Sequence, residues 1–416
     1  MIKIAIAGLG TVGAGLIRLI NANCPEVKII AVNARDKSKD RGVDISQYQW
    51  VDNAVDLASS DADIIVELIG GENGDALNLV KAALSNGKNV VTANKAMLAH
   101  HGGELAKLAE ENNAVLAYEA AVAGGIPVIK TLREGLAANK IVDITAILNG
   151  TSNYILTDMA KSGREFAEIL QEAQAKGYAE ADPSFDVGGI DAAHKICLLA
   201  ANAFSKRPNF ADIYVEGIEK ITPLDISFAA KLGYKIKHLC YTRAHEKGVE
   251  LRAHPSLIPA HYELANVDDV YNSVEIAADP VGDIILIGRG AGAGPTASAV
   301  AADIIDIMNN RKTPTFTTPY NEMEDMKIIP IAEIESEYYL RLEVDDESGV
   351  LEEVTNILKE YKISVRKIMQ DEPEDEHAQL IIIAHKAQES IMQNAVAELA
   401  NMASVEAAPQ LIRVLT

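Results

Sequence analysis

A glycine-rich turn at the start of the chain constrains the fold more than any other part of the sequence. Ile2 to Ala7 is an apolar run of strand length, and Gly8-Leu9-Gly10-Thr11-Val12-Gly13 follows it directly. The first glycine allows a tight turn, the second lets the backbone approach a phosphate, and the third lets the next helix pack closely on the strand. The pattern predicts a βαβ unit that binds a dinucleotide. The contacting residues would be Gly8, Gly10, Thr11, Val12 and Gly13.

Residues 1–125 continue this pattern as alternating strands and helices. Apolar, β-branched runs of strand length recur, and helical patterns separate them. The predicted strands are Lys28–Asn33, Ile64–Leu68, Asn89–Thr92 and Ala114–Tyr118, with helices at Val12–Asn21, Asp75–Asn86 and Glu104–Asn112. This alternation is typical of a doubly wound parallel sheet, so the fold class is α/β with an N-terminal Rossmann domain.

The pattern changes beyond residue 125. Residues 126–294 are expected to form a central α+β domain, with a mixed sheet covered by helices on one face. Asn149 to Asn153 is expected to be a polar turn. The glycine-rich stretch Gly288–Gly294 precedes a helix, and we expect the segment at about 295–318 to return to the first domain, with Gly292 within reach of the cofactor.

The last part of the chain has a different organisation. Residues 319–337 are expected to be a linker, and residues 338–416 a compact C-terminal unit. The strands and helices of this unit follow the order β-α-β-β-α-β. That order is typical of a ferredoxin-like fold.

Composition excludes several classes of partner. The 416 residues carry a formal net charge of −22, which disfavours binding to nucleic acid or to an anionic membrane. Three scattered cysteines, without a CxxC pair, favour a reducing compartment over a disulfide framework or a zinc site. The sequence shows neither a signal peptide nor an apolar run long enough to span a bilayer. We therefore expect a cytoplasmic protein.

The end of the second predicted strand should decide which nicotinamide cofactor is bound. Asn33 stands near the position where an acidic residue would hold the ribose of NAD. Arg35, Lys37 and Lys39 follow it and could accommodate the 2′-phosphate of NADP, whereas Asp36 points the other way. The segment favours NADP, or tolerance of both cofactors, with Arg35 as a contact.

A short run of charged residues suggests the chemistry. Asp186, Asp191 and Lys195 lie in a segment that passes from a glycine turn into an apolar helix, and Asp191 and Lys195, four apart, share one helix face. Carboxylates can hold an amine, and a lysine can polarise a carbonyl or exchange a proton with its oxygen. Lys95, at the end of the predicted strand Asn89–Thr92, could serve the same oxygen. The alternative for Asp191 and Lys195 is an ordinary surface ion pair.

These motifs, together with Glu119–Pro127, Asn149–Tyr154 and Gly177–Pro183, closely resemble homoserine dehydrogenases of the monofunctional form with a C-terminal ACT domain. The resemblance covers nearly the whole chain. It implies NAD(P)-dependent interconversion of L-homoserine and L-aspartate 4-semialdehyde in threonine, methionine and isoleucine biosynthesis. It implies catalytic roles for Lys195, our favoured proton donor, and Lys95. The substrate-binding residues that it implies are Glu180, Asp186, Asp191, Tyr178 and Thr151.

The resemblance also implies sites away from the reaction. A monovalent cation, usually sodium, would bind to Glu119 and to backbone carbonyls near Val122, Gly124 and Ile126. Asp345 and Gly349 match the ligand loop of ACT domains, which implies feedback inhibition by threonine; a dimerisation module that binds no ligand is the alternative. A homodimer or homotetramer is expected.

Two other functions remain open from the sequence. An aspartate-semialdehyde dehydrogenase would need a nucleophilic cysteine with a paired base, and Cys24, Cys197 and Cys240 show no obvious partner. A non-catalytic protein that binds a nucleotide and an amino acid would not need Lys95 and Lys195 together. His194 is expected to be a packing or surface residue, because it faces away from Lys195 on a helix.

Overall fold

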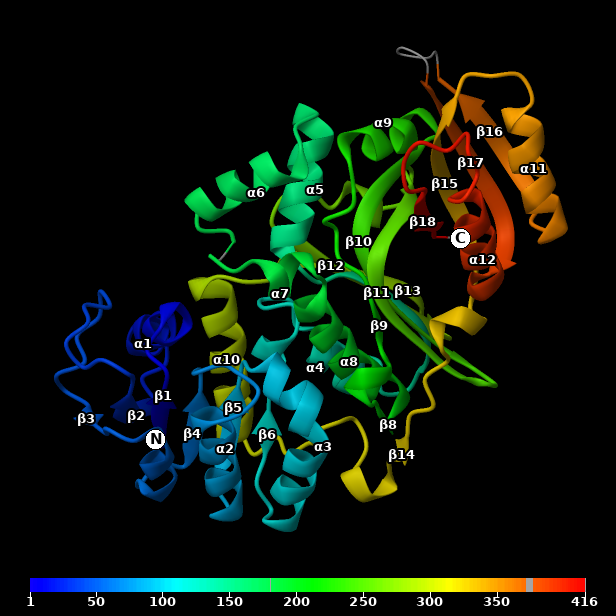
Figure 1. Ribbon diagram of the computed structural model, residues 1–416. Coiled ribbons are helices and arrows are strands. Elements are labelled where there is room, and N and C mark those ends of the chain that lie inside the picture. Colours follow the sequence, from blue (N-terminus) through cyan, green and yellow to red (C-terminus); the bar gives the residue numbers. More distant parts are fainter. Residues whose placement is uncertain (180, 372–376, 416) are drawn as a thin grey trace.

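The computed structural model describes residues 1–179, 181–371 and 377–415. Figure 1 shows the N-terminal region at the lower left, in blue and cyan, and the C-terminal region at the upper right, in orange and red. The central region, in green, lies between them. None of the helices in the described part of the chain is long and apolar enough to cross a membrane.

The N-terminal region is the doubly wound sheet that the sequence predicts. Its strands are β1 (Ile2–Ala7), β2 (Val27–Asn33), β3 (Gln49–Trp50), β4 (Ile64–Glu67), β5 (Asn89–Thr92) and β6 (Leu116–Ala117). They pair in parallel, in the order β3-β2-β1-β4-β5-β6. The main helices are α1 (Thr11–Asn23), α2 (Asp75–Ser85) and α3 (Lys95–Glu111). β4 is buried on both faces, as its continuous apolar run requires.

Helix α3 begins earlier than its sequence pattern suggests. The predicted start at Glu104 is wrong, because α3 begins at Lys95. Asn94 caps it, since its side chain accepts a hydrogen bond from the Met97 amide. The glycines Gly102 and Gly103 hid the helical pattern. The cap fixes Lys95 at the first helical position, directly beyond the C-terminal end of β5.

Helix α10 (Ala293–Met308) closes the N-terminal region from far along the chain. It packs against α1, with Ala297, Val300 and Ile304 in the same buried cluster as Leu16 and Ile20. A side chain at Gly15 would meet the Ala293 carbonyl oxygen at 2.8 Å, so the two helices are in close contact.

The central region is built on long antiparallel strands. They are β7 (Lys140–Ile147), β10 (Tyr234–His245), β11 (Gly248–Pro259), β12 (Tyr271–Asp279) and β13 (Gly282–Arg289), with the short β8 (Lys206–Arg207) and β9 (Tyr214–Val215). Their helices are α4 (Val128–Lys130), α5 (Gly150–Ser162), α6 (Phe166–Ala175), α7 (Ser184–Val187), α8 (Ile190–Phe204) and α9 (Pro223–Lys231). The expected polar turn at Asn149–Asn153 is wrong: Asn149 is the N-cap of α5, and its side chain accepts from the Ser152 amide.

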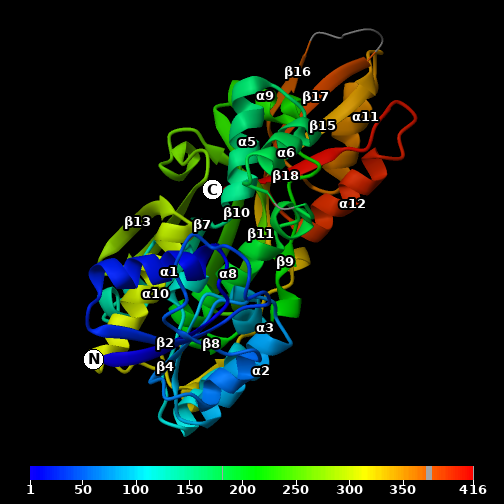
Figure 2. The ribbon, with the colours of Figure 1, turned by 90° about the vertical axis from the view of Figure 1, so that its left-hand side faces the viewer.

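The C-terminal region has the predicted β-α-β-β-α-β order. Its elements are β15 (Glu335–Asp345), α11 (Val350–Glu360), β16 (Val365–Gln370), β17 (His377–Gln388), α12 (Glu389–Leu399) and β18 (Gln410–Val414), preceded by β14 (Glu324–Asp325). The sheet order is β18-β15-β17-β16. Both views place α11 and α12 on one face of this sheet (Figures 1 and 2).

The last strand joins the central and C-terminal sheets. β18 pairs antiparallel with β15 and in parallel with β11, so the sheet is continuous from β13 to β16. The sequence did not suggest this junction, because β18 reads only as the final strand of the C-terminal unit. The pairing places the C-terminal region directly against the region that carries the charged run.

Candidate active site

A cavity of about 550 Å³ lies between the N-terminal and central regions. The residues that line it include Lys95, Asn149, Thr151, Tyr178, Asp186, Asp191 and Lys195. Val12 and Gly292 line the same cavity, so it reaches the glycine turn. The charged run, the second lysine and the cofactor motif, which are far apart in the sequence, therefore share one space.

Asp191 is the centre of the charged group. It lies at the start of α8, and the residue is 3% exposed. The Lys195 ammonium donates to Asp191 Oδ2 at 2.6 Å, and Lys95 Nζ lies 3.2 Å from Asp191 Oδ1. Lys195 also donates to the Leu148 carbonyl oxygen at 2.7 Å. The alternative of a surface ion pair is excluded, because Asp191 and Lys195 are both buried.

Asn149 joins the two carboxylates, a role that we did not predict from the sequence. Its side-chain amide donates to Asp186 Oδ1 and to Asp191 Oδ2, each at 2.8 Å. The same side chain caps α5 through its oxygen. The signal in the sequence was Asn149 before Gly150-Thr151-Ser152, which is typical of a helix N-cap.

The turn into α8 requires glycine. Gly189 has φ +84°, and a side chain there would meet His238 Nε2 at 2.9 Å and the Glu216 carbonyl oxygen at 3.2 Å. The chain therefore passes close to the 214–219 segment before α8 begins. This close packing fixes Asp191 at the first turn of α8, where a carboxylate is also favoured by the helix dipole.

The two carboxylates have opposite pKa shifts. Burial raises the pKa of Asp186, and the charge of Asp191 raises it further. Burial opposes ionisation of Asp191 as well, but the charges of Lys195 and Lys95 outweigh it and hold the pKa of Asp191 below its ordinary range. Asp191 is therefore the permanent anion that keeps the two lysines together.

Thr151 and Tyr178 lie at the rim of this group. The Thr151 hydroxyl donates to the Tyr178 carbonyl oxygen at 2.8 Å and lies 3.5 Å from Asp186 Oδ2. Tyr178 is 47% exposed, and its ring packs edge-on against Tyr154. Glu180, the remaining predicted substrate residue, lies outside the described residues.

The glycine turn fits a dinucleotide. A side chain at Gly8 (φ +97°) would meet the Leu68 carbonyl oxygen at 2.3 Å, and one at Gly13 would meet the Gly8 carbonyl oxygen at 2.1 Å. None of the described residues lies within 4 Å of the position that a side chain at Gly10 would take, which leaves room for a phosphate. Thr11 begins α1, whose N-terminus favours an anion.

A second cavity, of about 790 Å³, continues from the glycine turn along the end of β2. Its lining includes Gly8, Gly10, Asn33, Arg35, Lys39 and Arg41. Arg41 was missed from the sequence: its guanidinium donates to the carbonyl oxygens of Leu9 and Lys39. Asn33 donates to the Val51 and Asp52 carbonyl oxygens, so a neutral amide occupies the position near which an acid would select NAD.

The Glu119 loop is packed against helix α4. Both oxygens of the Glu119 carboxylate accept backbone hydrogen bonds, from Ile129 and Lys130, at 2.9 Å each. Burial and the nearby Asp303 carboxylate raise the pKa of Glu119 to about 7. A side chain at Gly124 would meet the Gly290 carbonyl oxygen at 2.3 Å. The carboxylate thus caps α4, which leaves backbone carbonyls as the freer oxygen donors of the 119–126 loop.

His194 and the cysteines are packing residues. His194 stacks on Phe210, and burial lowers its pKa to about 4. All three cysteines are buried and unpaired. Burial raises the pKa of the Cys197 thiol to about 12 and also raises those of Cys24 and Cys240. A thiolate nucleophile is therefore disfavoured at each position.

Comparison with protein families gives matches in three consecutive parts of the chain. Residues 8–119 match the family described as "Homoserine dehydrogenase, NAD binding domain", and residues 127–305 match "Homoserine dehydrogenase". Residues 338–403 match "ACT domain". The second match contains Asp186, Asp191 and Lys195.

Individual relatives match over almost their full length. The chain is 43% identical to the homoserine dehydrogenase of Neisseria gonorrhoeae and 42% identical to that of Pseudomonas aeruginosa, in each case over 99% of this chain and 98% of the relative. A crystal structure of a homoserine dehydrogenase from Thiobacillus denitrificans superposes with a TM-score of 0.94, at 39% identity, over 100% of this chain and 98% of that one. A hyperthermophilic archaeal homoserine dehydrogenase in complex with NADPH covers 74% of this chain, at 27% identity and a TM-score of 0.65.

Proposed function

The chain belongs to the homoserine dehydrogenase family, and on that premise we propose that the Asp191–Lys195 pair is where the substrate oxygen gains or loses its proton. The protein is an NAD(P)-dependent oxidoreductase that acts on a CH–OH group, interconverting L-homoserine and L-aspartate 4-semialdehyde. The proposal rests on one observation. Lys195 lies 2.6 Å from a buried, ionised carboxylate, in a cavity that it shares with Lys95.

The charges of the site support these roles. A bound nicotinamide cofactor exchanges the hydride with the substrate carbon. Lys195 has three N–H donors, two of which are directed to Leu148 and Asp191, so one remains for the substrate oxygen. In the reduction Lys195 gives its proton to that oxygen, and in the oxidation it takes the proton back. Lys95 stabilises the negative charge that develops on the oxygen.

The substrate's ammonium group would lie on the other side of the cavity. Asp186, joined to Asp191 by Asn149, supplies the nearest partly exposed carboxylate. Thr151 and Tyr178 border this position, and Glu180 would add a second carboxylate. Asp191 itself is engaged by both lysines and by Asn149, so its role is to hold them.

Replacing Lys195 with alanine tests this assignment. General acid–base catalysis contributes roughly 10²- to 10⁴-fold, so kcat for homoserine oxidation should fall by about that factor. The Kd of the cofactor should change less than twofold, because the glycine turn is untouched. Lys107→Ala is the matched control, since Lys107 forms an i,i+4 pair with Glu111 that is exposed. Wild-type turnover in Lys195→Ala would overturn the assignment.

We propose that the enzyme uses NADP, with tolerance of NAD. Arg35, Lys39 and Arg41 line the cavity at the end of β2 and could accommodate a 2′-phosphate. Initial rates with the two cofactors test this. Arg41→Ala should raise KM for NADP and leave KM for NAD unchanged; an equal effect on both cofactors would contradict it.

The predicted sodium site remains a proposal, with its ligands shifted from the side chain to the backbone. Because Glu119 caps α4, we propose that backbone carbonyls of the 119–126 loop, those of Val122, Gly124 and Ile126 among them, supply the hard oxygen donors. Activity in sodium chloride compared with choline chloride at equal ionic strength would test it.

The ACT region suggests a regulatory amino acid, and we propose threonine as that effector. Asp345 ends β15, and Gly349, with φ +105°, precedes α11, as in a ligand loop. Inhibition by threonine should disappear in a chain that ends after residue 330 or in Gly349→Val. We further propose a homodimer or homotetramer in the cytoplasm, where the three free cysteines would stay reduced.

A further inference from the structure

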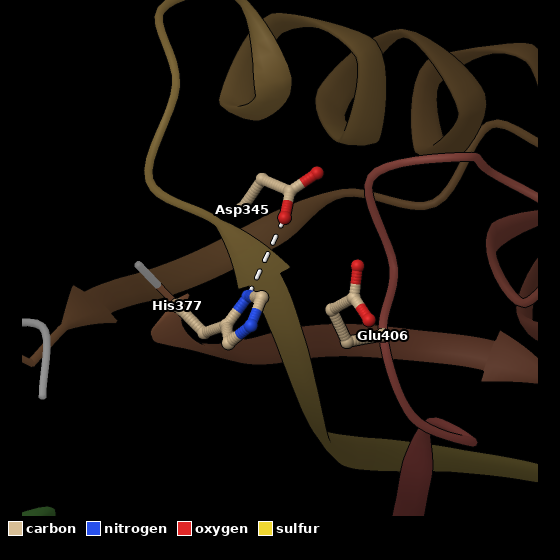
Figure 3. Close-up of side chains that lie close together, drawn as sticks. All are labelled: Asp345, His377 and Glu406. Atoms are coloured by element: carbon tan, nitrogen blue, oxygen red, sulfur yellow. Dashed lines mark ion pairs between the residues drawn. The ribbon is translucent and has the colours of Figure 1, made fainter. Parts of the chain in front are cut away.

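We infer that Asp345, His377 and Glu406 form a binding site for a divalent transition-metal ion in the C-terminal region. One ligand atom from each residue lies within 4.8 Å of the other two. Figure 3 shows Asp345 at the end of its strand, His377 beside it and Glu406 on the neighbouring segment. The site is separate from the Asp191 cavity and does not depend on the proposed catalytic roles.

The backbone places the three side chains on one face of the sheet. Asp345 and His377 are direct partners in the antiparallel pair β15–β17. On the other side of β15, a bridge pairs Val344 with Val405, and the Glu406 amide donates to the Glu343 carbonyl oxygen at 3.0 Å. Glu406 therefore shares the face of Glu343, and alternation along the strand gives Asp345 the same face. Strand register, rather than mobile side chains alone, brings the ligands together.

The geometry between Asp345 and His377 suits two ligands of one ion better than a hydrogen bond. His377 Nδ1 lies 3.4 Å from the nearer oxygen of Asp345, whereas a charge-assisted hydrogen bond is about 2.7–2.9 Å long. This nitrogen is buried and has no hydrogen-bond partner among the described residues. Ligands bound at about 2.0–2.2 Å from a tetrahedral ion lie roughly 3.3–3.6 Å apart.

The ligand set indicates the class of ion. One imidazole nitrogen and two carboxylate oxygens suit Zn²⁺ and neighbouring transition metals, whereas Mg²⁺ and Ca²⁺ favour oxygen ligands throughout. Glu406 is exposed, and Asp345 and His377 are half-buried, so water can complete the coordination. The net charge of the chain, −22, attracts cations to its surface.

Metal binding would fix three segments that are distant in the sequence. Asp345 precedes the loop that leads to α11, His377 begins β17, and Glu406 lies just before β18. Since Glu406 lies on the segment that leads into β18, an ion held here would tie that segment to β15 and β17. The chelate would restrain the Asp345–Gly349 loop directly.

Zinc binding by the full-length protein tests the inference. Equilibrium dialysis against Zn²⁺ should give one ion per chain in the wild type, and Mg²⁺ at the same concentration should not displace it. His377→Ala and Glu406→Gln should each raise the Kd at least tenfold. His385→Ala is the matched control, because His385 is exposed on the same strand, β17. X-ray absorption of the bound ion should show nitrogen and oxygen ligands without sulfur.

Two further readouts separate loss of the site from loss of the fold. Homoserine oxidation should stay at the wild-type level in both variants, because the ligands lie outside the active-site cavity. Glu406 is exposed, so Glu406→Gln should also fold normally. Unchanged Kd and stoichiometry in these two variants, or no zinc bound by the wild type at micromolar concentrations, would overturn the inference.

Discussion

The molecule contains two buried clusters, each of which pairs acidic with basic side chains, and the two can be compared directly. In the first, Asp191 holds Lys195 and Lys95 beside the active-site cavity. In the second, Arg413 of β18 holds Glu389 of α12 and Glu216 of the central region, where the two sheets join. Both have a buried side chain at their centre. They differ in their surroundings: Lys195 lines the active-site cavity, whereas Arg413 lines neither of the two cavities described above.

Four of the five N–H donors of Arg413 are used by other protein groups. Arg413 donates to both oxygens of Glu389 at 2.6 and 2.8 Å, to Glu216 at 2.9 Å and to the Tyr214 hydroxyl at 2.9 Å. Tyr338 donates to Glu389 as well, at 2.9 Å. Lys195 directs two of its three N–H donors to Leu148 and Asp191, and it lines the active-site cavity. A spare donor beside a cavity can act on a ligand, whereas a densely bonded ion pair away from that cavity stabilises a junction.

The largest expected effect is on the Arg413 group. Arg413→Ala would leave Glu389 buried without its cation, and breaking a buried pair from one side costs about 3–5 kcal/mol. The free energy of unfolding of the C-terminal region, measured by urea denaturation, should fall by that amount. The kcat of the folded protein should change less than tenfold.

A more exposed ion pair provides the control for Arg413. Arg366→Ala removes a more exposed pair with Glu337 in the same region and should cost no more than about 1 kcal/mol. Equal destabilisation by the two substitutions would show that burial of the Arg413 ion pair has no special stabilising effect.

A smaller effect is expected at Asn149, which donates hydrogen bonds to two carboxylates inside the active site. Asn149→Ala removes two hydrogen bonds to carboxylates, and loss of the equivalent of one of them, about 1.5–3 kcal/mol, would lower kcat/KM for homoserine roughly 10- to 150-fold. The Kd of NADP should stay unchanged, because Asn149 does not line the 790 Å³ cavity beside Gly8 and Gly10. A decrease in stability with normal kcat/KM would instead group Asn149 with Arg413.

The smallest expected effect is on the pH dependence of kcat/KM. Burial, reinforced by the charge of Asp191, raises the pKa of Asp186. In its proposed role Asp186 would bind the substrate ammonium only when ionised. As pH falls through this raised pKa, Asp186 becomes neutral and kcat/KM for homoserine should fall by up to about tenfold per pH unit. In Asp186→Asn this acid limb should be absent and kcat/KM uniformly low. An unchanged acid limb in that variant would assign the titration to another group.

The fold was predictable wherever a local pattern was strong. The glycine turn, the alternating N-terminal strands and the final β-α-β-β-α-β order each depend on neighbouring residues, and the structure confirms them. β10 and β12 were missed. In β10, buried positions carry Lys237, His238 and Thr242, so the usual alternation of apolar and polar residues is hidden.

The site was predictable only within single segments. The i,i+4 spacing brought Asp191 and Lys195 together correctly, since helix geometry alone decides it. Asn149 bonds to Asp186 and Asp191, which lie 37 and 42 positions further along the chain. The contact of Lys95 with Asp191 joins the N-terminal and central regions. Such contacts depend on tertiary packing, which residue spacing does not encode. The junction through Arg413 was missed for the same reason.

The proton-transfer role of Lys195 can be tested most directly by chemical rescue. In Lys195→Ala, added ethylamine can occupy the space of the missing side chain and supply an ammonium beside Asp191. Turnover should rise with amine concentration in this variant, and the extent of rescue should follow the pKa of the amine used. In Lys95→Ala, where only electrostatic stabilisation is lost, the rescue should not depend on the pKa of the amine. Rescue that depends on amine pKa in Lys95→Ala but is absent in Lys195→Ala would contradict the account and assign the proton to Lys95.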